Sequence, residues 1–319
     1  MKIIVCEYLH ADGVSLMEAA GHSVFYDLAL HERRDELRTR LADTDALLVR
    51  NQTLVDSELT AGAAGLKVVG RLGVGLDNIN IPDMNERGII VTWAPGSNAV
   101  SVAEYVLGAI LELSRSFPKF SAMVHGGTWD RQAFMGSEVS GKTLGIVGLG
   151  DIGGRTARRA AAFGMRVLAN DPFLNDSSAA VGENGVELTT LADLLARSDF
   201  VSLHAPLVDG TRRLMNAETL SRMKPGAYLI NTARGGLVDE AALVNALASG
   251  ALAGAVLDVR DPEPPGPDDP MRGLENVMLT PHIAGVSFEA NRRVSMHVAS
   301  DVLNVLAGDA PVSRAPGSV

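Results

Sequence analysis

The chain has 319 residues, of which 46% are hydrophobic and 21% are charged, so it holds enough apolar material for a large packed core. Single cores rarely grow beyond roughly 250–300 residues, and this length therefore predicts two domains. The formal net charge of −10 argues against nucleic-acid binding, which favours a basic surface.

The cysteine content and the hydropathy pattern indicate a cytoplasmic protein. One cysteine, Cys6, cannot form a disulfide within the chain, as expected in a reducing compartment. The N-terminus begins with a strand-like segment, and no apolar run approaches the roughly 20 residues needed to span a bilayer. We expect neither a membrane partner nor a metal site.

Short apolar runs alternate with helical patterns in the first third of the chain. The alternation predicts strands at 2–6, 23–26, 46–49, 67–71 and 89–92, and helices at 12–20, 33–42 and 57–64. Strands that alternate with helices imply a parallel sheet covered on both faces.

A second alternation follows a long helical pattern at 100–116, for which Ser97 or Asn98 is the expected N-cap. A polar connection at 126–141 leads into it. The predicted strands are 143–148, 166–170, 200–203, 228–231, 255–258 and 277–279, with helices such as 153–163 and 240–249 between them. Six strands at this spacing match a complete dinucleotide-binding sheet.

The last predicted helix, at about 287–307, is too short to form a domain and is expected to pack back on the first one. We therefore predict an α/β fold with two Rossmann-like, doubly wound domains and an active site in the cleft between them. Residues 1–98 plus 285–319 form a discontinuous, flavodoxin-like substrate-binding domain, and 99–284 form the NAD-binding domain. The last dozen residues, rich in Ala, Pro, Ser and Gly, are predicted to be a loose tail.

A glycine motif points to a dinucleotide cofactor. Gly148, Gly150 and Gly153 form a G-x-G-x-x-G pattern directly after a predicted strand and before a helix, which is the context that makes this motif specific. The glycines permit a tight turn and a close approach of a pyrophosphate to the helix N-terminus. Asp151 places a negative charge in this loop, and we expect it to point into solvent.

The predicted cofactor is NAD. Asp171 ends the next strand, 18 residues beyond Gly153, where a carboxylate accepts hydrogen bonds from the adenosine ribose hydroxyls. A carboxylate at this position would repel the 2′-phosphate of NADP. His204 opens another strand-end loop, His204-Ala205-Pro206, and is expected to form part of an adenosine wall.

Three further residues follow predicted strands and suit hydroxy-acid chemistry. Arg234 offers a forked guanidinium for a carboxylate, His282 offers a proton shuttle, and Glu263 beside it would favour the imidazolium and fix the tautomer. Each residue alone is more often structural. Together, behind a dinucleotide motif, they predict a dehydrogenase.

These segments resemble the D-isomer-specific 2-hydroxyacid dehydrogenases, and most closely the D-3-phosphoglycerate dehydrogenase branch. The resemblance covers nearly the whole chain. Its most specific stretches are GRLGVGLDNI (70–79), WDRQAFMG (129–136), GKTLGIVGLG (141–150), MKPGAYLINTARGG (223–236) and LTPHIAG (279–285).

The resemblance implies a role for each matching residue. Arg234 would bind the substrate carboxylate, His282 would act as acid and base, and Glu263 would be its partner. Asp258 would lie near the nicotinamide amide. The implied cofactor contacts are Gly148, Gly150, Asp151, Ile152, Gly153, Asp171, His204, Ala205, Pro206, Thr232, Ala233, Asp258 and Gly285. The implied substrate contacts are Arg71, Val74, Gly75, Asn98 and Arg234.

The chain also departs from the family pattern. Arg260 stands where the family usually has Phe, and we expect it to add a cation near the cleft or an interface. Formate dehydrogenases of this family carry Gln in the role of Glu263, which argues against formate. Phosphoglycerate dehydrogenases often carry C-terminal regulatory domains, and this chain ends after the closing helix, so serine feedback is not expected.

The substrate stays open at this point. If Arg71 meets a second anion, phosphoglycerate is the first candidate and sulfolactate the alternative; if Arg71 is a structural residue, lactate or glycerate come into play. We expect a homodimer, in which Arg131 contributes across the interface. A non-catalytic, NAD(H)-sensing corepressor is the rival class, and the Arg–Glu–His set argues against it.

Overall fold

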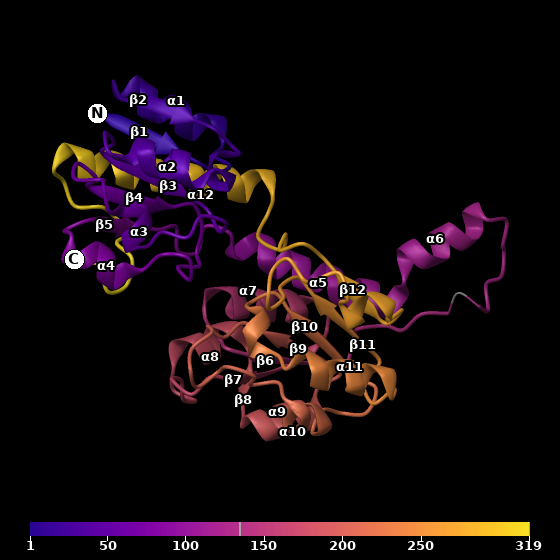
Figure 1. The fold of residues 1–319 in the computed structure, drawn as a ribbon. Helices are drawn as coiled ribbons and strands as arrows, with labels where there is room; N and C mark the ends of the chain where they lie inside the picture. The colour runs from indigo at the N-terminus through magenta and orange to yellow at the C-terminus, as the bar shows by residue number, and fades with distance from the viewer. Residues whose placement is uncertain (134, 319) are drawn as a thin grey trace. The chain divides into compact units, whose positions relative to one another are not determined.

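The computed structural model describes residues 1–133 and 135–318, and the chain divides into two compact units. Unit 1 comprises Met1–Asn98 and Val286–Val319, and unit 2 comprises Ala99–Gly285. Each unit holds one parallel β-sheet with helices on both faces (Figure 1). The predicted α/β class is confirmed. In the part of the chain that the structure describes, no helix is both long and apolar enough to cross a bilayer.

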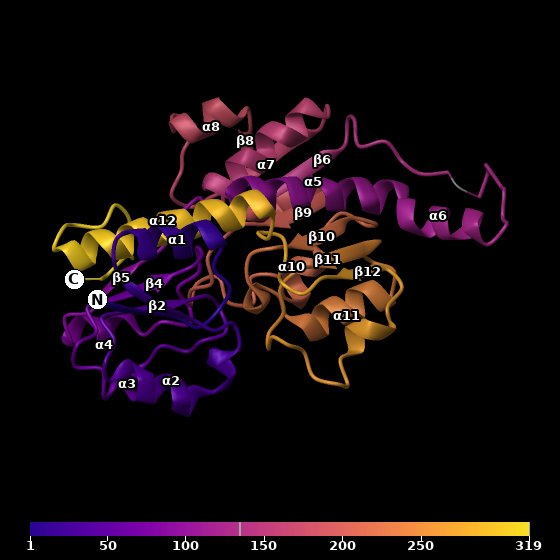
Figure 2. The same ribbon diagram turned by 90° about the horizontal axis from the view of Figure 1, so that it is seen from above.

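The sheet of unit 1 has the strand order β2-β1-β3-β4-β5, which is the flavodoxin-like order. Its strands are β1 (Lys2–Val5), β2 (Ser23–Tyr26), β3 (Ala46–Val49), β4 (Val68–Arg71) and β5 (Ile90–Thr92). Helices α1 (Ala11–Ala19) and α12 (Phe288–Ala307) cover one face, and α2 (Arg34–Leu41), α3 (Ser57–Thr60) and α4 (Ile81–Glu86) cover the other (Figure 2). The apolar sides of these helices build one buried cluster on each face.

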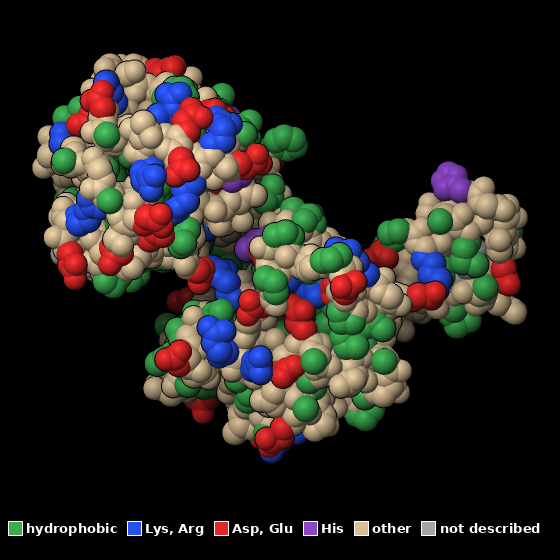
Figure 3. All heavy atoms as spheres, in the orientation of Figure 1, with side chains coloured by type: hydrophobic (Ala, Val, Ile, Leu, Met, Phe, Trp, Pro, Cys, Tyr) green, Lys and Arg blue, Asp and Glu red, His purple; other side chains and the backbone are tan. Residues whose placement is uncertain are grey.

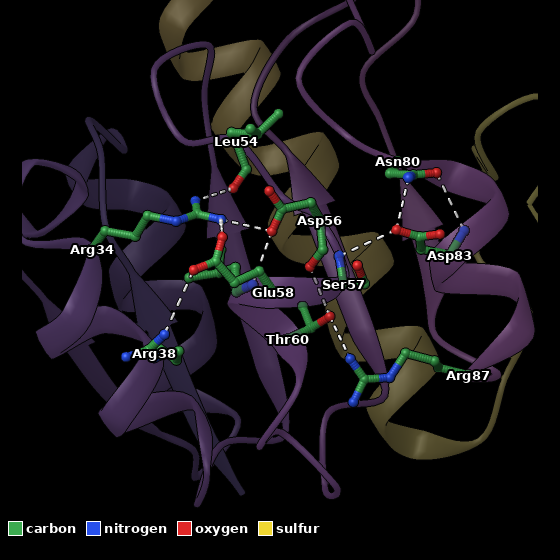
Figure 4. Close-up of polar contacts among 11 residues, drawn as sticks. Arg34, Arg38, Leu54, Asp56, Ser57, Glu58, Thr60, Asn80, Asp83 and Arg87 are labelled. Atoms are coloured by element: carbon green, nitrogen blue, oxygen red, sulfur yellow. Dashed lines mark hydrogen bonds and ion pairs between the residues drawn. The ribbon is translucent and has the colours of Figure 1, made fainter.

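A polar network ties α2, α3 and α4 together (Figure 4). The Arg34 guanidinium contacts the Asp56 carboxylate at 2.6 Å, and Asp56 in turn accepts the backbone N–H of Leu59 at the start of α3. Arg87, which follows α4, donates to the Thr60 hydroxyl at the other end of α3. Helix α3 has four residues and is thus fixed by side chains at both ends.

The C-terminal segment is packed, so the prediction of a loose tail is wrong. The N–H of Ala315 donates to the carbonyl of Val91 on the edge strand β5, and the Ser318 hydroxyl accepts the N–H of Val91. The buried carboxylate of Asp301 accepts the N–H of Val312 at 2.7 Å. Backbone pairing at the sheet edge holds this segment, and composition does not report on such pairing.

The sheet of unit 2 has the order β12-β11-β10-β9-β6-β7-β8. Its strands are β6 (Thr143–Val147), β7 (Arg166–Asn170), β8 (Glu187–Leu188), β9 (Phe200–Leu203), β10 (Tyr228–Asn231), β11 (Gly254–Leu257) and β12 (Val277–Leu279). The six predicted strands are present, and the seventh, β8, has two residues, too few for a periodic pattern. One buried cluster lies under α5 (Ala99–Arg115), α7 (Asp151–Ala162) and α8 (Ala179–Asn184), and the other under α9 (Leu191–Arg197), α10 (Ala217–Ser221) and α11 (Glu240–Ala248).

Two features of unit 2 bear on function. The strand order reverses between β6 and β9, and ligands of open α/β sheets bind at the carboxyl ends of strands beside such a reversal. A segment containing helix α6 (Phe117–His125), which the sequence pattern did not predict, extends away from the rest of the unit in both views (Figures 1 and 2).

Candidate active site

The glycine loop after β6 has the geometry of a phosphate cradle. Gly148 has a φ of 94°, and a Cβ on Gly153 would lie 2.2 Å from the carbonyl oxygen of Gly148. Helix α7 begins at Asp151, two residues earlier than predicted, with Gly150 as its N-cap. A Cβ on Gly150 would meet no atom within 4 Å, so the backbone here is open to a ligand. These residues fit a dinucleotide pyrophosphate.

The two acidic residues near this loop have different environments. Asp151 is exposed and pairs with Arg155 at 2.6 Å, one turn along α7. Asp171 follows β7 and accepts the N–H of Leu149 and that of Phe173, each at 3.0 Å. Each Asp171 oxygen keeps lone-pair capacity, since a carboxylate oxygen accepts two hydrogen bonds. The structure thus fixes a carboxylate beside the glycine loop.

His204 follows β9, the strand next to β6. Its ring nitrogen Nε2 lies 2.9 Å from the Ser202 hydroxyl. Burial lowers the pKa of His204 to about 4, so the ring is neutral at physiological pH. A neutral ring suits the wall of an adenosine pocket, and Ala205 and Pro206 continue the same loop.

The loop after β10 carries Arg234. The buried side chain of Asn231 accepts the N–H of Ala233 at 3.1 Å and donates to the carbonyl of Arg234 at 2.8 Å. The Arg234 guanidinium also donates to the Ala233 carbonyl at 2.6 Å. Among the described residues, the Thr232 hydroxyl is a buried polar atom without a hydrogen-bond partner. Asn231 therefore fixes the loop from which Arg234 projects.

Glu263 and His282 lie in contact. The His282 Nδ1 is 2.8 Å from the Glu263 Oε2. Partial burial works to raise the pKa of the Glu263 carboxyl, but the hydrogen bonds from His282 and the Arg260 N–H, with the nearby charges of His282 and Arg234, lower it overall. Glu263 is therefore ionised at neutral pH and lies close enough to feel the charge of Arg234.

Asp258 organises the loop that carries His282. It is 1% exposed, and its carboxylate accepts the N–H groups of Ile283 and Ala284 at 2.8 Å and the Thr280 hydroxyl at 2.7 Å. His282 has a φ of 57°, in the left-handed region that non-glycine residues rarely occupy. Its N–H donates to the Asp258 carbonyl. The Asp258 carboxylate thus contacts this loop, and Gly285 follows directly after it.

Unit 1 carries its predicted residues at the end of β4. Arg71 is buried and donates to the Leu72 carbonyl at 2.9 Å, and Val74 and Gly75 follow in the same loop. The side-chain oxygen of Asn98 is buried without a hydrogen-bond partner within the described chain.

Arg50, which the sequence analysis did not single out, follows β3 directly. Val49 is in register with Arg71 on β4, so the two arginines leave neighbouring strands at the same sheet edge. Arg50 donates to the Asn291 side chain at 2.8 Å and lies over the ring of Tyr8. Its position after an apolar strand was the available signal.

Arg260 differs from its expectation. It is 9% exposed, and its guanidinium is bound by the carboxylates of Glu240 and Asp269, so its charge is paired within unit 2. Glu240 lies 20 residues before Arg260 and Asp269 lies nine residues after it, and no sequence pattern identifies either as its partner.

Unit 2 therefore combines a dinucleotide-binding sheet with an arginine and a carboxylate–histidine pair along the carboxyl edge of that sheet. This combination is typical of nicotinamide-dependent dehydrogenases. Residues 107–284 match the family model described as "D-isomer specific 2-hydroxyacid dehydrogenase, NAD binding domain", which supports the predicted cofactor.

Curated relatives and solved structures agree with this match. An (S)-sulfolactate dehydrogenase from Chromohalobacter salexigens is 46% identical over 95% of this chain and 98% of its own length. A D-3-phosphoglycerate dehydrogenase from Archaeoglobus fulgidus is 41% identical over 97% of this chain, which spans 58% of that relative. A crystal structure of a Thermus thermophilus protein superimposes with a TM-score of 0.91 at 36% identity, covering 99% of this chain and 100% of that one. The chain belongs to the D-isomer specific 2-hydroxyacid dehydrogenase family.

The position of Asp171 predicts its effect on cofactor choice. We expect Asp171→Ala to raise the KM for NAD about ten- to 150-fold, the range for losing a charge-assisted hydrogen bond of roughly 1.5–3 kcal/mol. The preference for NAD over NADP should narrow, because the repelling carboxylate is gone. Steady-state kinetics with both cofactors measures this, and Asp176→Ala, an exposed acid on the same connection, is the control. An Asp171 variant that rejects NADP as strongly as the parent contradicts the assignment.

Proposed function

We propose that this protein is an NAD-dependent D-2-hydroxyacid dehydrogenase acting on a small acid that carries a second anionic group. The observation that supports it most is that Arg234, Glu263 and His282 follow β10, β11 and β12 of one dinucleotide-binding sheet, with Glu263 and His282 in contact. Unit 2 is the proposed NAD-binding domain, and unit 1 the proposed substrate-binding domain.

The proposed chemistry assigns one task to each residue. NAD, when bound, accepts or supplies the hydride at C2. Arg234 binds the substrate carboxylate through its planar fork. Because Glu263 engages Nδ1 of His282, Nε2 is left to take the hydroxyl proton during oxidation and to return it during reduction. The ionised Glu263 balances the positive charge that His282 gains. The other cofactor contacts proposed on resemblance are Ile152, Thr232, Ala233, Asp258 and Gly285.

The second anionic group is proposed to meet the arginines of unit 1. Arg71 and Arg50 leave adjacent strands at one sheet edge, and the backbone amides of Val74 and Gly75 follow. Asn98, with its buried and unpartnered side-chain oxygen, is a further proposed contact. Phosphoglycerate is the first candidate substrate. Sulfolactate is the second, on the strength of the Chromohalobacter relative.

The acid/base role of His282 has a direct test. We expect His282→Ala to lower kcat at least about 100-fold, the scale for losing a general acid/base, while NADH affinity changes little. Steady-state turnover assays measure kcat, and fluorescence titration measures the affinity for NADH. The neighbouring exposed residue Ile283→Ala serves as the control. Parallel losses of turnover and NADH binding would remove His282 from the proposed role.

The substrate assignment is tested by a ratio of activities. NAD reduction is measured with D- and L-lactate, glycerate, phosphoglycerate and both sulfolactate enantiomers, first for the parent protein and then for Arg71→Ala and Arg50→Ala. We expect kcat/KM for the dianionic acid to fall about ten- to 150-fold, the value of one charge-assisted contact. Activity on lactate or glycerate should change little. Equal losses of kcat/KM on the dianionic acid and on lactate or glycerate would indicate that these arginines have a structural role.

A homodimer is the proposed assembly. Large apolar side chains of the segment around α6 are exposed, namely Phe117 (54%), Val124 (40%), Trp129 (82%) and Met135 (79%), and hydrophobic atoms are visible on this segment in Figure 3. No residue of α6 is buried. Clustered exposed apolar residues mark protein contacts, and an arm of unit 2 suits a second copy of the same chain. Arg131 belongs to the same segment.

The dimer proposal predicts a change of mass on mutation. We expect light scattering to give twice the 33.5 kDa of one chain, and the Trp129→Ser/Met135→Ser double variant to shift toward one chain. Phe173→Ser removes a side chain that is 91% exposed elsewhere in unit 2, so it should leave the mass unchanged. A double variant that keeps the parent mass contradicts this interface.

The proposed location is the cytoplasm. Cys6 is buried and hydrogen-bonds to Thr53, and burial raises the pKa of its thiol to about 12. The chain holds one cysteine and therefore no internal disulfide, which supports a reducing compartment.

A further inference from the structure

Arg260 occupies a buried ion cluster that adjoins the proposed acid/base pair. Its Nε and Nη2 donate to the two oxygens of Glu240 at 2.8 and 2.7 Å, and its Nη1 and Nη2 donate to the two oxygens of Asp269 at 2.8 Å. The Arg260 side chain is 6% exposed and that of Asp269 is 2% exposed. Helix α11 supplies Glu240, and Asp269 caps the short 3-10 helix Pro270–Gly273. The guanidinium is therefore clamped from two elements.

We propose that Arg260 is a positioning residue that holds Glu263 against His282; this inference rests on the proposed function of that pair. The backbone N–H of Arg260 donates to Oε1 of Glu263 at 2.8 Å, while the other oxygen, Oε2, engages His282. The backbone of Arg260 thus orients the Glu263 carboxylate through one oxygen, and the other oxygen contacts the imidazole of His282.

The backbone of Arg260 also packs closely against the loop that carries Arg234. A Cβ on Gly235 would lie 2.1 Å from the carbonyl oxygen of Arg260, so only glycine lets the two segments pack at this distance. The backbone of Arg260 therefore contacts the segment behind Arg234 and the carboxylate beside His282. The ion pairs of the Arg260 side chain therefore restrain a backbone segment that contacts both the Arg234 loop and Glu263.

A buried ion pair is weak evidence for stability, because desolvation offsets most of the attraction between the charges. We infer that the cluster instead contributes a fixed orientation of the Arg260 side chain. Two bidentate contacts fix the orientation of the planar guanidinium, and this restrains the backbone to which it is attached. The Glu240 carboxylate also accepts the N–H of Asp261, which extends the constraint toward Glu263.

The test compares the effect of Arg260 in two backgrounds. Arg260→Met is made in the parent protein and in Glu263→Gln. In the parent we expect kcat on the preferred acid to fall about ten- to 100-fold, the scale of a misplaced catalytic group, with NADH affinity unchanged. In the Glu263→Gln background the same change should cost less than about twofold, because residues that act as a unit are not additive. A loss of equal size in both backgrounds overturns the proposal.

Two further variants keep the test decisive. Lys224→Met breaks the Lys224–Asp199 ion pair, which lies where β9 begins, at the opposite edge of the same sheet, and should leave kcat unchanged in both backgrounds. Glu240→Gln keeps the shape of its side chain and removes one charge, so it replaces Arg260→Met if that variant does not fold. It should show a smaller kcat loss that again disappears with Glu263→Gln, and persistence of the loss contradicts the proposal.

A spectroscopic measurement separates this inference from the proposed function. With nitrogen-labelled histidine, the hydrogen-bonded Nδ1 proton of His282 should give a low-field resonance that His282→Ala removes. We expect Arg260→Met to abolish or broaden this signal and Lys224→Met to keep it. This result needs no substrate, so it stands even if none of the acids is oxidised. An unchanged signal in Arg260→Met overturns the positioning role.

Discussion

In a parallel sheet the loops that follow the strands all lie along the same edge, and the chemistry proposed for unit 2 depends on this constraint. The glycine loop, Asp171, His204 and Arg234 follow β6, β7, β9 and β10, and the Glu263 and His282 loops follow β11 and β12. Residues separated by more than a hundred positions therefore meet along one edge. The reversal of strand order between β6 and β9 opens that edge to a dinucleotide.

The loops at this edge are irregular, and buried side chains substitute for regular structure in holding them. The Asn231 side chain pairs with the backbone of Ala233 and Arg234, and the Asp258 carboxylate accepts three hydrogen bonds from the segment around His282. A left-handed residue costs roughly 1–3 kcal/mol, so His282 keeps its backbone conformation only because its surroundings fix it. The proposed proton transfer needs this fixed ring, since a rotamer change would separate the His282 Nδ1 from Glu263.

Much of this arrangement was predictable because it has a local signal. The strands β6, β7 and β10 are apolar runs that end in turn or polar residues, and Gly148, Gly150 and Gly153 carry a motif in its proper context. What escaped prediction depends on contacts between distant residues. The two-residue strand β8 exists only because β7 offers an unpaired edge, and the C-terminal segment is ordered by Val91 and Asp301. The pairing of Arg260 was not predicted, because no local sequence pattern indicates that Glu240 and Asp269 enclose its guanidinium.

The charges near the site act over short distances, so the acidic net charge of the chain is compatible with the proposed anionic substrate. The carboxylates near the strand ends already have partners: Asp151 pairs with Arg155, Glu263 with His282, and Asp258 with backbone N–H groups. Interactions between exposed charges decay over about 8 Å at physiological ionic strength, so the net charge of −10 contributes little at this edge. Glu240 and Asp269 together more than balance the charge of Arg260, whereas the charges of His282 and Arg234 both act on Glu263 and lower the pKa of its carboxyl. A substrate carboxylate that approaches Arg234 is therefore attracted by its guanidinium, while the nearby carboxylate of Glu263 is already hydrogen-bonded to His282.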